Sequence, residues 1–428
     1  PEAADVVVIG GGIVGTSTTL FLAERGLKVV LCEKGHVAGE QSSRNWGWCR
    51  QAKRDPREFD LIRGAMELWR GMDARVGAPT GFATTGILFS AATEAKEAYY
   101  AEWVKEAAAA GIASEMLSGA ALAKVLPGDT APKRAALWCP SDGRAEPQKA
   151  APAIAAAARR LGATVLGDCA VRGLETAGGR ILGVVTERGT IRTSRVVVAT
   201  GAWSRRFLAD LGIRLPQLKV RASVLRTSPV ADGPEPALWD HDFAFRKRLD
   251  GGYTIANGHV NVVPIVPDSF RFMRDYLPAL KTEYASLKLR FGARFFEEWA
   301  EAAPRPLDRP SVYETVRVLD PKPDVGYLVS ALEALAKRFP AFSGARIVQA
   351  WAGFIDAMPD AVPVISETET LSGLVVATGF SGHGFGIGPG AGRLVADMVA
   401  GSTPFVDPRE FRLSRFGDGS PIRYVAGL

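Results

Sequence analysis

The chain begins with a glycine-rich turn between an apolar run and a helical pattern, and this turn constrains the fold most. Residues 6–9 are continuously apolar, which is typical of a strand buried on both faces of a parallel sheet. Glycines at 10, 12 and 15 then form the pattern G-x-G-x-x-G. Residues 16–25 have helical periodicity, and Gly26 supplies a helix stop. The pattern predicts a dinucleotide-binding βαβ unit.

Each residue of this fingerprint has an expected physical task. Gly10 permits the tight turn, Gly12 lets backbone N–H groups approach a pyrophosphate, and Gly15 lets the helix pack on the strand. The N-terminus of the predicted helix places partial positive charge beneath the phosphates, and Ile13 and Val14 before it are candidate cofactor contacts.

A second apolar strand pattern, residues 27–32, ends at Glu33. A carboxylate at this spacing can accept hydrogen bonds from a ribose diol. It disfavours NADP, because it would repel the additional ribose phosphate.

Two later segments favour FAD over NAD. Residues 195–203 predict a strand that runs into a small-residue turn, after a hairpin-like stretch at 181–192. Thr200, Gly201 and Trp203 in this turn are candidate cofactor contacts, although a core strand with an ordinary turn has the same pattern.

The second segment lies near the end of the chain. Residues 373–378 predict a strand, 379–392 a loop with seven glycines, and 393–400 a helix. A glycine loop before a helix can hold an anion such as a reduced flavin. A second phosphate site or a simple helix cap remains the alternative.

Together these segments resemble the D-amino acid oxidase-like flavoproteins, a family that includes glycine oxidase, sarcosine oxidase and the small subunit of D-amino acid dehydrogenases. The matching pieces run in family order over nearly the whole chain. They are residues 6–15 with Glu33-Lys34, Gln41-Ser42-Ser43-Arg44-Asn45, Asp142-Gly143-Arg144-Ala145-Glu146-Pro147, residues 196–203, Trp351-Ala352-Gly353 with Pro359-Asp360, and residues 378–392.

The resemblance implies a mixed α/β fold, in which a glutathione-reductase-type Rossmann domain binds FAD and a mainly antiparallel sheet forms an inserted substrate domain. We expect the FAD domain to comprise residues 1–85, 145–215 and 340–428, and the substrate domain residues 86–144 and 216–339. Strands are expected within 217–227 and 252–263, and helix over 268–299.

The resemblance also implies cofactor contacts beyond the fingerprint. They are Lys34, Ser42, Ser43, Arg44, Asn45, Val171, Gly382, His383, Gly384, Phe385 and Gly386. We expect FAD to be bound noncovalently. The last cysteine is Cys169, so the thioether linkage from a late cysteine is impossible, and His36 is displaced from the linkage histidine of dimethylglycine dehydrogenase-like members.

The resemblance implies fewer specific residues for substrate binding. Arg50 is the first candidate for binding a substrate carboxylate, with Trp48 and Phe354 beside the substrate and Arg221, Arg246 and Arg248 as alternatives. A surface or phosphate-side arginine remains the alternative for Arg50.

Three further residues lie at positions where the family carries functional groups. Asp356 could face a cationic amine or cap a turn, and His383 could bond the flavin or the substrate, or brace the backbone. Gly386 stands where N-methyl amino acid oxidases have a lysine, so we expect a missing charge and additional space there.

Three functions are compatible with this pattern. The first is FAD-dependent oxidation of an amine or amino acid at its C–N bond, giving an imine that hydrolyses, with secondary or N-substituted amines and D-amino acids among the expected substrates. The second is C–O oxidation of a hydroxy acid or polyol phosphate. The third is a flavin subunit of a larger dehydrogenase complex. O2 or another molecule would accept the electrons.

Composition excludes several other classes. The net charge of +6 fits a mildly basic surface, an anionic substrate or weak attraction to an anionic membrane surface. Basic residues form no run that would predict nucleic-acid binding. No apolar run is long enough to span a membrane and no signal peptide is recognisable, so we expect a cytoplasmic protein. The four cysteines and four histidines are dispersed, which fits a reducing compartment and predicts no metal site.

Overall fold

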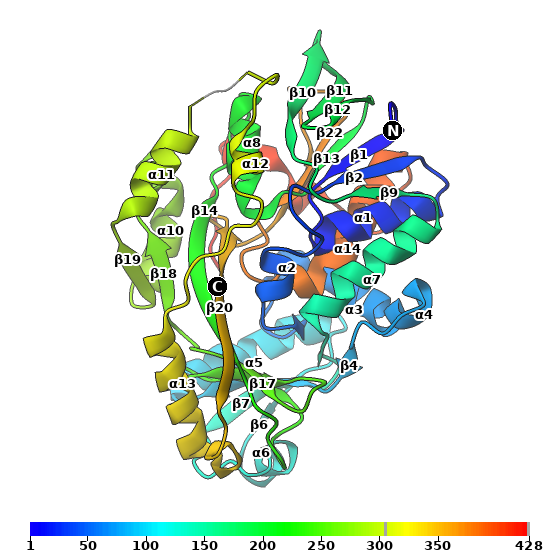
Figure 1. Cartoon of the computed structure of the whole chain (residues 1–428). Helices are drawn as coiled ribbons and strands as arrows, with labels where there is room; N and C mark the ends of the chain where they lie inside the picture. Colours follow the sequence, from blue (N-terminus) through cyan, green and yellow to red (C-terminus); the bar gives the residue numbers. More distant parts are fainter. Residues whose placement is uncertain (304–305, 426–428) are drawn as a thin grey trace.

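A six-stranded sheet forms the centre of one half of the molecule in this computed structural model, which describes residues 1–303 and 306–425 (Figure 1). Its strands are parallel except for the edge strand β21. In spatial order they are β21 (Val364–Glu367), β22 (Leu374–Thr378), β13 (Val196–Val198), β1 (Val6–Ile9), β2 (Val29–Cys32) and β9 (Thr164–Leu166).

The apolar run of β1 is explained by burial on both faces. Val6 and Val8 belong to one core cluster, together with residues of the helices on that side, whereas Val7 and Ile9 belong to another. The helices of the first cluster are α1 (Ile13–Glu24), α3 (Phe59–Arg70), α7 (Pro147–Arg160) and α14 (Gly384–Ala400). The second cluster includes the meander β10 (Val171–Ala177), β11 (Arg180–Thr186) and β12 (Gly189–Arg192), and helix α8 (Ser204–Asp210).

The helix α14 begins earlier than the sequence predicted. We expected a loop through residue 392, but only residues 379–383 are non-helical and α14 starts at Gly384. Its glycines allow close packing on neighbouring helices. A Cβ atom at Gly388 would lie 2.8 Å from an Ile13 side-chain carbon, and one at Gly392 would lie 2.5 Å from the Ser17 Cβ.

A larger, mainly antiparallel sheet forms the other half. Its path is β19 (Leu287–Arg290), β18 (Asn261–Pro264), β14 (Leu218–Thr227), β17 (Tyr253–Ala256), β16 (Ala244–Lys247), β15 (Ala237–Trp239), β5 (Ile87–Ala91), β7 (Ala135–Cys139) and β6 (Glu115–Leu117), with β20 (Ile347–Ala357) pairing β14. The helices α5 (Glu94–Ala109), α6 (Gly119–Val125) and α13 (Val325–Arg338) lie in this half (Figure 1). This architecture confirms the predicted mixed α/β fold with a largely antiparallel second sheet.

The predicted helix over 268–299 is interrupted. The structure has α9 (Pro267–Arg271), α10 (Met273–Glu283), the strand β19 and then α11 (Ala293–Glu301). Leu287 and Leu289 alternate with basic residues, and this segment pairs in parallel with the edge of β18. Strand pairing therefore overrides the helical pattern that the aromatic residues suggested.

A further small sheet lies in the connections, where β3 (Trp48–Cys49) and β4 (Ala83–Thr84) both pair with β8 (Gly143–Arg144). The strand β20 belongs to the predicted 340–428 segment but pairs along β14. The domain boundaries stay predictions. Among the described residues, no helix is both long and apolar enough to cross a membrane.

Candidate cofactor and substrate site

A cavity of about 300 Å³ connects the fingerprint with the larger sheet. Most predicted site residues line it. They are Gly10, Gly12, Ile13, Val14, Glu33, Lys34, Ser42, Arg44, Asn45, Trp48, Arg50, Val171, Thr200, Gly201, Trp203, Arg221, Phe354, Asp356, Gly382, His383, Gly384, Phe385 and Gly386. Gly15, Ser43 and Arg248 do not line it.

The glycines of the fingerprint are required for different reasons. Gly10 has φ +108°, and a Cβ there would lie 2.4 Å from the Ala199 carbonyl oxygen. A Cβ at Gly15 would lie 1.9 Å from the Gly10 oxygen, so Gly15 serves the packing of α1 on β1. Gly12 borders the cavity, and its Cβ would meet only the Ser42 Oγ, at 3.0 Å.

The N-terminus of α1 points into the cavity beside Ser42. The Ser42 Oγ accepts a hydrogen bond from the Ile13 N–H at 2.8 Å. Ser42 lies on the short helix α2 (Gln41–Arg44), and Arg44 is held there by the Ala352 carbonyl at 2.8 Å. The first N–H groups of a helix have no partner within it, so this end can receive a phosphate group.

The Glu33 carboxylate is fixed at the end of β2. Its oxygens accept hydrogen bonds from the Gly11 N–H at 2.7 Å and the Gly35 N–H at 2.8 Å. Burial raises the pKa of Glu33. The neighbouring Lys34 ammonium bonds Glu40 and the Val316 carbonyl, each at 2.7 Å, so it also joins two segments of the wall.

These donors and acceptors fit a dinucleotide. A helix N-terminus lies at the expected pyrophosphate position, and the half-buried Glu33 carboxylate lies at the expected ribose position. Val171, Thr200 and Trp203 line the same cavity, and the Trp203 Nε1–H donates to Glu40 at 3.1 Å.

Asp356 braces the turn that follows β22. Its carboxylate accepts hydrogen bonds from the Gly379 N–H at 2.8 Å and from the Thr378 hydroxyl at 3.3 Å. Burial raises the pKa of Asp356 to about 6. Although the residue borders the cavity, its observed contacts match the turn-capping alternative.

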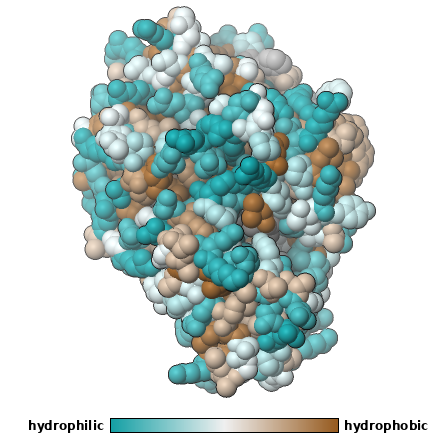
Figure 2. Space-filling view, turned by 180° about the vertical axis from the view of Figure 1, so that it is seen from behind, coloured by the Kyte–Doolittle hydropathy of each residue, from teal (hydrophilic) through white to brown (hydrophobic). Residues whose placement is uncertain are grey.

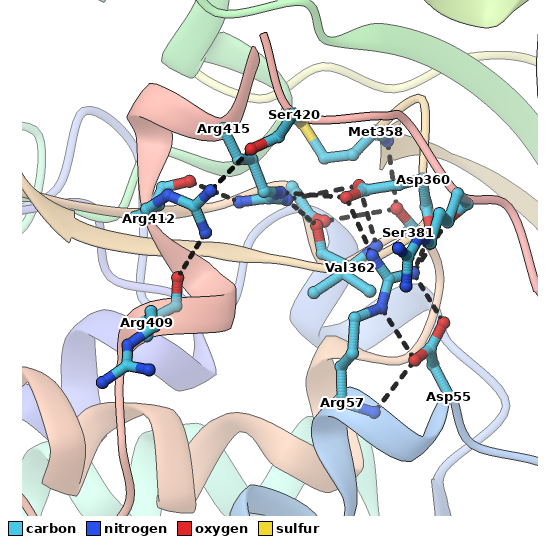
Figure 3. A network of polar contacts seen from close by, with 12 residues as sticks. Asp55, Arg57, Met358, Asp360, Val362, Ser381, Arg409, Arg412, Arg415 and Ser420 are labelled. Atoms are coloured by element: carbon cyan, nitrogen blue, oxygen red, sulfur yellow. Dashed lines mark hydrogen bonds and ion pairs between the residues drawn. The ribbon is translucent and has the colours of Figure 1, made fainter. Parts of the chain in front are cut away.

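A network of hydrogen bonds and ion pairs lies next to the same turn (Figure 3). The Ser381 Oγ accepts a hydrogen bond from the Met358 N–H at 3.0 Å, and Ser381 has φ +48°. Asp360 follows Met358 by two residues. Its carboxylate pairs with Arg415 at 2.9 Å and with Arg57 at 3.5 Å. Arg415 of the C-terminal segment therefore anchors the 358–362 segment, which in turn bonds the 379–383 turn through Met358.

His383 forms a buried pair with Glu58. The His383 Nε2 lies 2.7 Å from the Glu58 Oε1, which accepts a hydrogen bond when Nε2 carries the proton. Burial and the nearby Arg54 lower the pKa of His383. Burial opposes ionisation of Glu58, but His383 and Arg54 outweigh it and lower the pKa of that carboxyl.

The other end of the cavity presents two cations among aromatic rings. The Arg50 guanidinium lies 5.2 Å from the Phe89 ring centre, and the Lys53 ammonium lies 5.7 Å from that of Trp239. Within residues 1–303 and 306–425, neither side chain forms an ion pair with a carboxylate. Burial, followed by the charge of Lys96, lowers the pKa of Lys53 to about 8.

Sequence reasoning missed Lys53. Its backbone has φ +56°, a left-handed conformation that is uncommon for a residue other than glycine and that often occurs at functional sites. The available signal was the close spacing of Arg50, Lys53 and Arg54 in one short segment.

The alternative arginines differ in their surroundings. Arg221 borders the cavity but lies 3.6 Å from the Asp324 carboxylate. Arg246 is buried in a two-pronged pair with Glu146, at 2.8 and 3.2 Å. Arg248 pairs with Asp250 at 3.2 Å, away from the cavity lining. Ser43, also outside the lining, donates to the Glu40 carbonyl.

The expectation of additional space at Gly386 was wrong. A Cβ there would lie 3.0 Å from the Trp48 carbonyl oxygen and 3.1 Å from the Cys49 Cα. The backbone of β3 occupies the volume that a side chain would need. A side chain at this position would therefore require the backbone of β3 to shift by a few tenths of an ångström.

The structure also brings together two histidines that are far apart in sequence. The rings of His241 and His259 stack at 3.8 Å with an interplanar angle of 16°, beside Asp242. A metal ion binds in the plane of an imidazole ring, and two parallel rings cannot both direct their lone pairs at one ion in this arrangement. We assign no metal to the cluster.

Comparison with known proteins identifies the class that this fold and cavity define. The model of the family described as FAD dependent oxidoreductase (DAO) matches residues 5–398. The chain belongs to this family, and its cofactor is FAD. The predicted resemblance, the enzyme class and the cofactor are thereby confirmed.

The relatives differ in how much of their own length this chain matches. The solved L-amino acid deaminase from Proteus myxofaciens, in complex with anthranilate, is 35% identical, with a TM-score of 0.94 over 97% of this chain and 94% of that one. The 4-methylaminobutanoate oxidase (formaldehyde-forming) of Paenarthrobacter nicotinovorans is 27% identical over 97% of this chain and 46% of its own length. Sarcosine oxidase subunit beta of Rhizobium meliloti (strain 1021) is 25% identical over 97% and 89%.

The chain spans less than half the length of the first curated relatives that it matches.

Proposed function

We propose that this chain oxidises the C–N bond of an α-amino acid whose side chain is aromatic or otherwise apolar. One observation carries the proposal: Arg50 and Lys53, without carboxylate partners among the described residues, face an aromatic-walled end of the FAD cavity. Two cations suit a carboxylate, and the rings of Phe89, Trp239 and Trp48 suit an apolar side chain.

The relatives support the same class of substrate. One is an L-amino acid deaminase solved with anthranilate, an aromatic carboxylate, and others oxidise a methylamino acid or are a subunit of sarcosine oxidase. The bound molecule and the named substrates all combine a carboxylate with an amine.

The residues divide into two proposed groups. Gly12, Ile13 and Ser42 would hold the pyrophosphate, Glu33 the adenosine ribose, and residues 382–386 the flavin edge, with FAD bound noncovalently. FAD supplies the acceptor for the hydride that leaves the substrate carbon.

The protein residues would position the substrate rather than attack it. Arg50 and Lys53 would orient the carboxylate, and the aromatic wall would exclude water from the reacting carbon. An amine that arrives neutral needs no strong base, and the imine product then hydrolyses. The His383–Glu58 pair would brace the 379–383 turn, because both side chains are buried and already bonded to each other.

Anaerobic loss of the visible flavin absorbance tests the proposal directly. We would compare phenylalanine with its matched amine, phenethylamine, and its matched hydroxy acid, phenyllactate, in both enantiomers where they exist. The amino acid should bleach the flavin fastest, the amine measurably but more slowly, and phenyllactate not at all. Faster bleaching by phenyllactate would instead establish C–O oxidation.

The Arg50→Ala variant separates carboxylate binding from cofactor binding. Loss of one charge-assisted pair should lower kcat/KM for the amino acid roughly ten- to hundred-fold. Oxidation of the amine should change little and FAD content should stay normal. An equal loss on both substrates would remove Arg50 from the substrate site.

A second candidate is a flavin-carrying subunit of a larger assembly. The observation that favours it is length, because the chain covers 89% of a sarcosine oxidase subunit beta but less than half of longer relatives. Activity of the isolated chain in the amino acid assay would contradict a strict dependence on partners, whereas activity only after copurification with partners would support it.

A further inference from the structure

The outer surface of the segment from α9 to α11 is apolar, although it lies at the edge of the larger sheet. Phe291 and Phe296 are each 64% exposed and Trp299 is 66% exposed. Phe270, Met273 and Leu289 are also exposed, and among described residues the helices α9, α10 and α11 contain no buried position. We call these six residues the aromatic face.

The aromatic members of this face form one contiguous cluster. The half-buried Phe295 lies at its centre, with ring centres 5.3 Å from Phe291, 5.5 Å from Phe296 and 6.0 Å from Trp299. In Figure 2, seen from behind, apolar residues lie beside hydrophilic ones on the flank where this segment is located. Exposed apolar patches of this kind mark interaction surfaces.

In the segment that carries the aromatic face, the acidic side chains are bonded, whereas several basic side chains form no ion pair among the described residues. Three of these acidic side chains pair with cations from outside the segment: Asp268 with Arg205, Asp275 with Arg214, and Glu298 with Lys219. By contrast, four cations of the segment form no ion pair within the described part of the chain. They are Arg274, Lys281, Lys288 and Arg290.

We propose that the aromatic face docks on the surface of a bilayer containing anionic phospholipid. Tryptophan and phenylalanine favour the interface between headgroups and acyl chains, and unpaired lysine and arginine attract anionic headgroups. Docking would place the bilayer beside β18, whose Asn261 and Val262 border the cavity. The same charges disfavour a second copy as the occupant, because self-association would bring like cations together.

Vesicle flotation of the FAD-loaded protein tests this inference independently of the reaction. Vesicles of phosphatidylcholine alone would be compared with vesicles containing phosphatidylglycerol. The protein should float with the anionic vesicles, and raised salt should weaken this binding because it screens the exposed cations. No binding to anionic vesicles, or equal binding to both compositions, would overturn the proposal.

Two variants separate the contributions. Phe291→Ser with Trp299→Ser removes apolar contact, and Lys288→Gln with Arg290→Gln removes charge; each should lower the partition coefficient about ten-fold or more. Leu182→Ser is the matched control, because Leu182 is exposed on β11 in the other half of the molecule, and it should float like the wild type.

FAD content and melting temperature must match the wild type in every variant, and truncations at the same positions (Phe291→Ala, Trp299→Ala) replace any that fail. Sedimentation velocity tests whether a second copy of the chain binds the aromatic face instead of a bilayer. A concentration-dependent dimer that disappears in the Phe291→Ser, Trp299→Ser variant, without vesicle binding by the wild type, would assign the face to a second copy and overturn the proposal.

Discussion

Lys53 shows how one residue can combine several properties of a binding group. It lies at a cavity wall in a left-handed backbone conformation, near two aromatic rings, and burial lowers its pKa to about 8. A lysine of this kind is cationic at neutral pH but loses its charge just above it. Carboxylate binding through Lys53 should therefore depend on pH in an accessible range.

We predict that Lys53→Met lowers kcat/KM for an amino acid roughly ten- to hundred-fold at pH well below 8. Because the folded-state pKa lies below the ordinary value, the charge is present at low pH and is lost as pH rises through about 8. The ratio of wild-type to variant kcat/KM should thus fall towards one above that pH. Taking the ratio cancels titration of the substrate amine, and a ratio independent of pH would refute the role.

Gly12 tests the proposed pyrophosphate site. Its φ of −73° is available to any residue, so Gly12→Val introduces no backbone strain, unlike a substitution at Gly10. The valine methyl groups would instead occupy the cavity next to Ser42. We predict a folded protein that purifies without FAD, as judged by circular dichroism and the visible spectrum, with partial occupancy in Gly12→Ala. Normal FAD content in the valine variant would move the phosphates elsewhere.

At the scale of elements, the chain was most predictable where local spacing decides the structure. The strand, turn and helix from Val6 to Glu24, and the position of Glu33, follow from patterns within a short stretch. The start of α14 did not, because glycine has low helix propensity and its tolerance here comes from contact with Ile13 and Ser17. Nor could the sequence indicate that Arg246 pairs with Glu146, a residue distant in the chain.

Arg415 near the end of the chain anchors the segment around Asp360, which bonds the 379–383 turn through Met358. Arg415→Met should leave the buried Asp360 with the more distant Arg57 as its main cation. Breaking a buried pair in this way typically costs about 3–5 kcal/mol. We predict a clear fall in melting temperature, whereas Arg409→Met, on the same segment but exposed, should have almost no effect. Equal melting temperatures for the two variants would show that the network does not stabilise the fold.

At the scale of the whole molecule, the FAD cavity is built from segments that are far apart in sequence. Its walls include the turn after β1, residues of β14 and β20 in the larger sheet, and the start of α14. Local patterns could predict the expected pyrophosphate and ribose contacts, because Gly10, Gly12 and Glu33 lie within one short stretch of sequence. The substrate end is assembled only when both sheets are in place, so the choice among its arginines needed the structure.

This construction predicts that bound FAD stabilises the complete fold. A ligand that binds only the folded state adds about 2.7 kcal/mol when its free concentration is one hundred times its Kd. Acid precipitation should release intact FAD, because the binding is proposed to be noncovalent. Apoprotein prepared under milder conditions should melt at a lower temperature than the holoprotein, and added FAD should restore both the melting temperature and the colour. Colour that stays with the acid precipitate would establish a covalent link, and equal melting temperatures for apoprotein and holoprotein would show that FAD does not couple the two sheets.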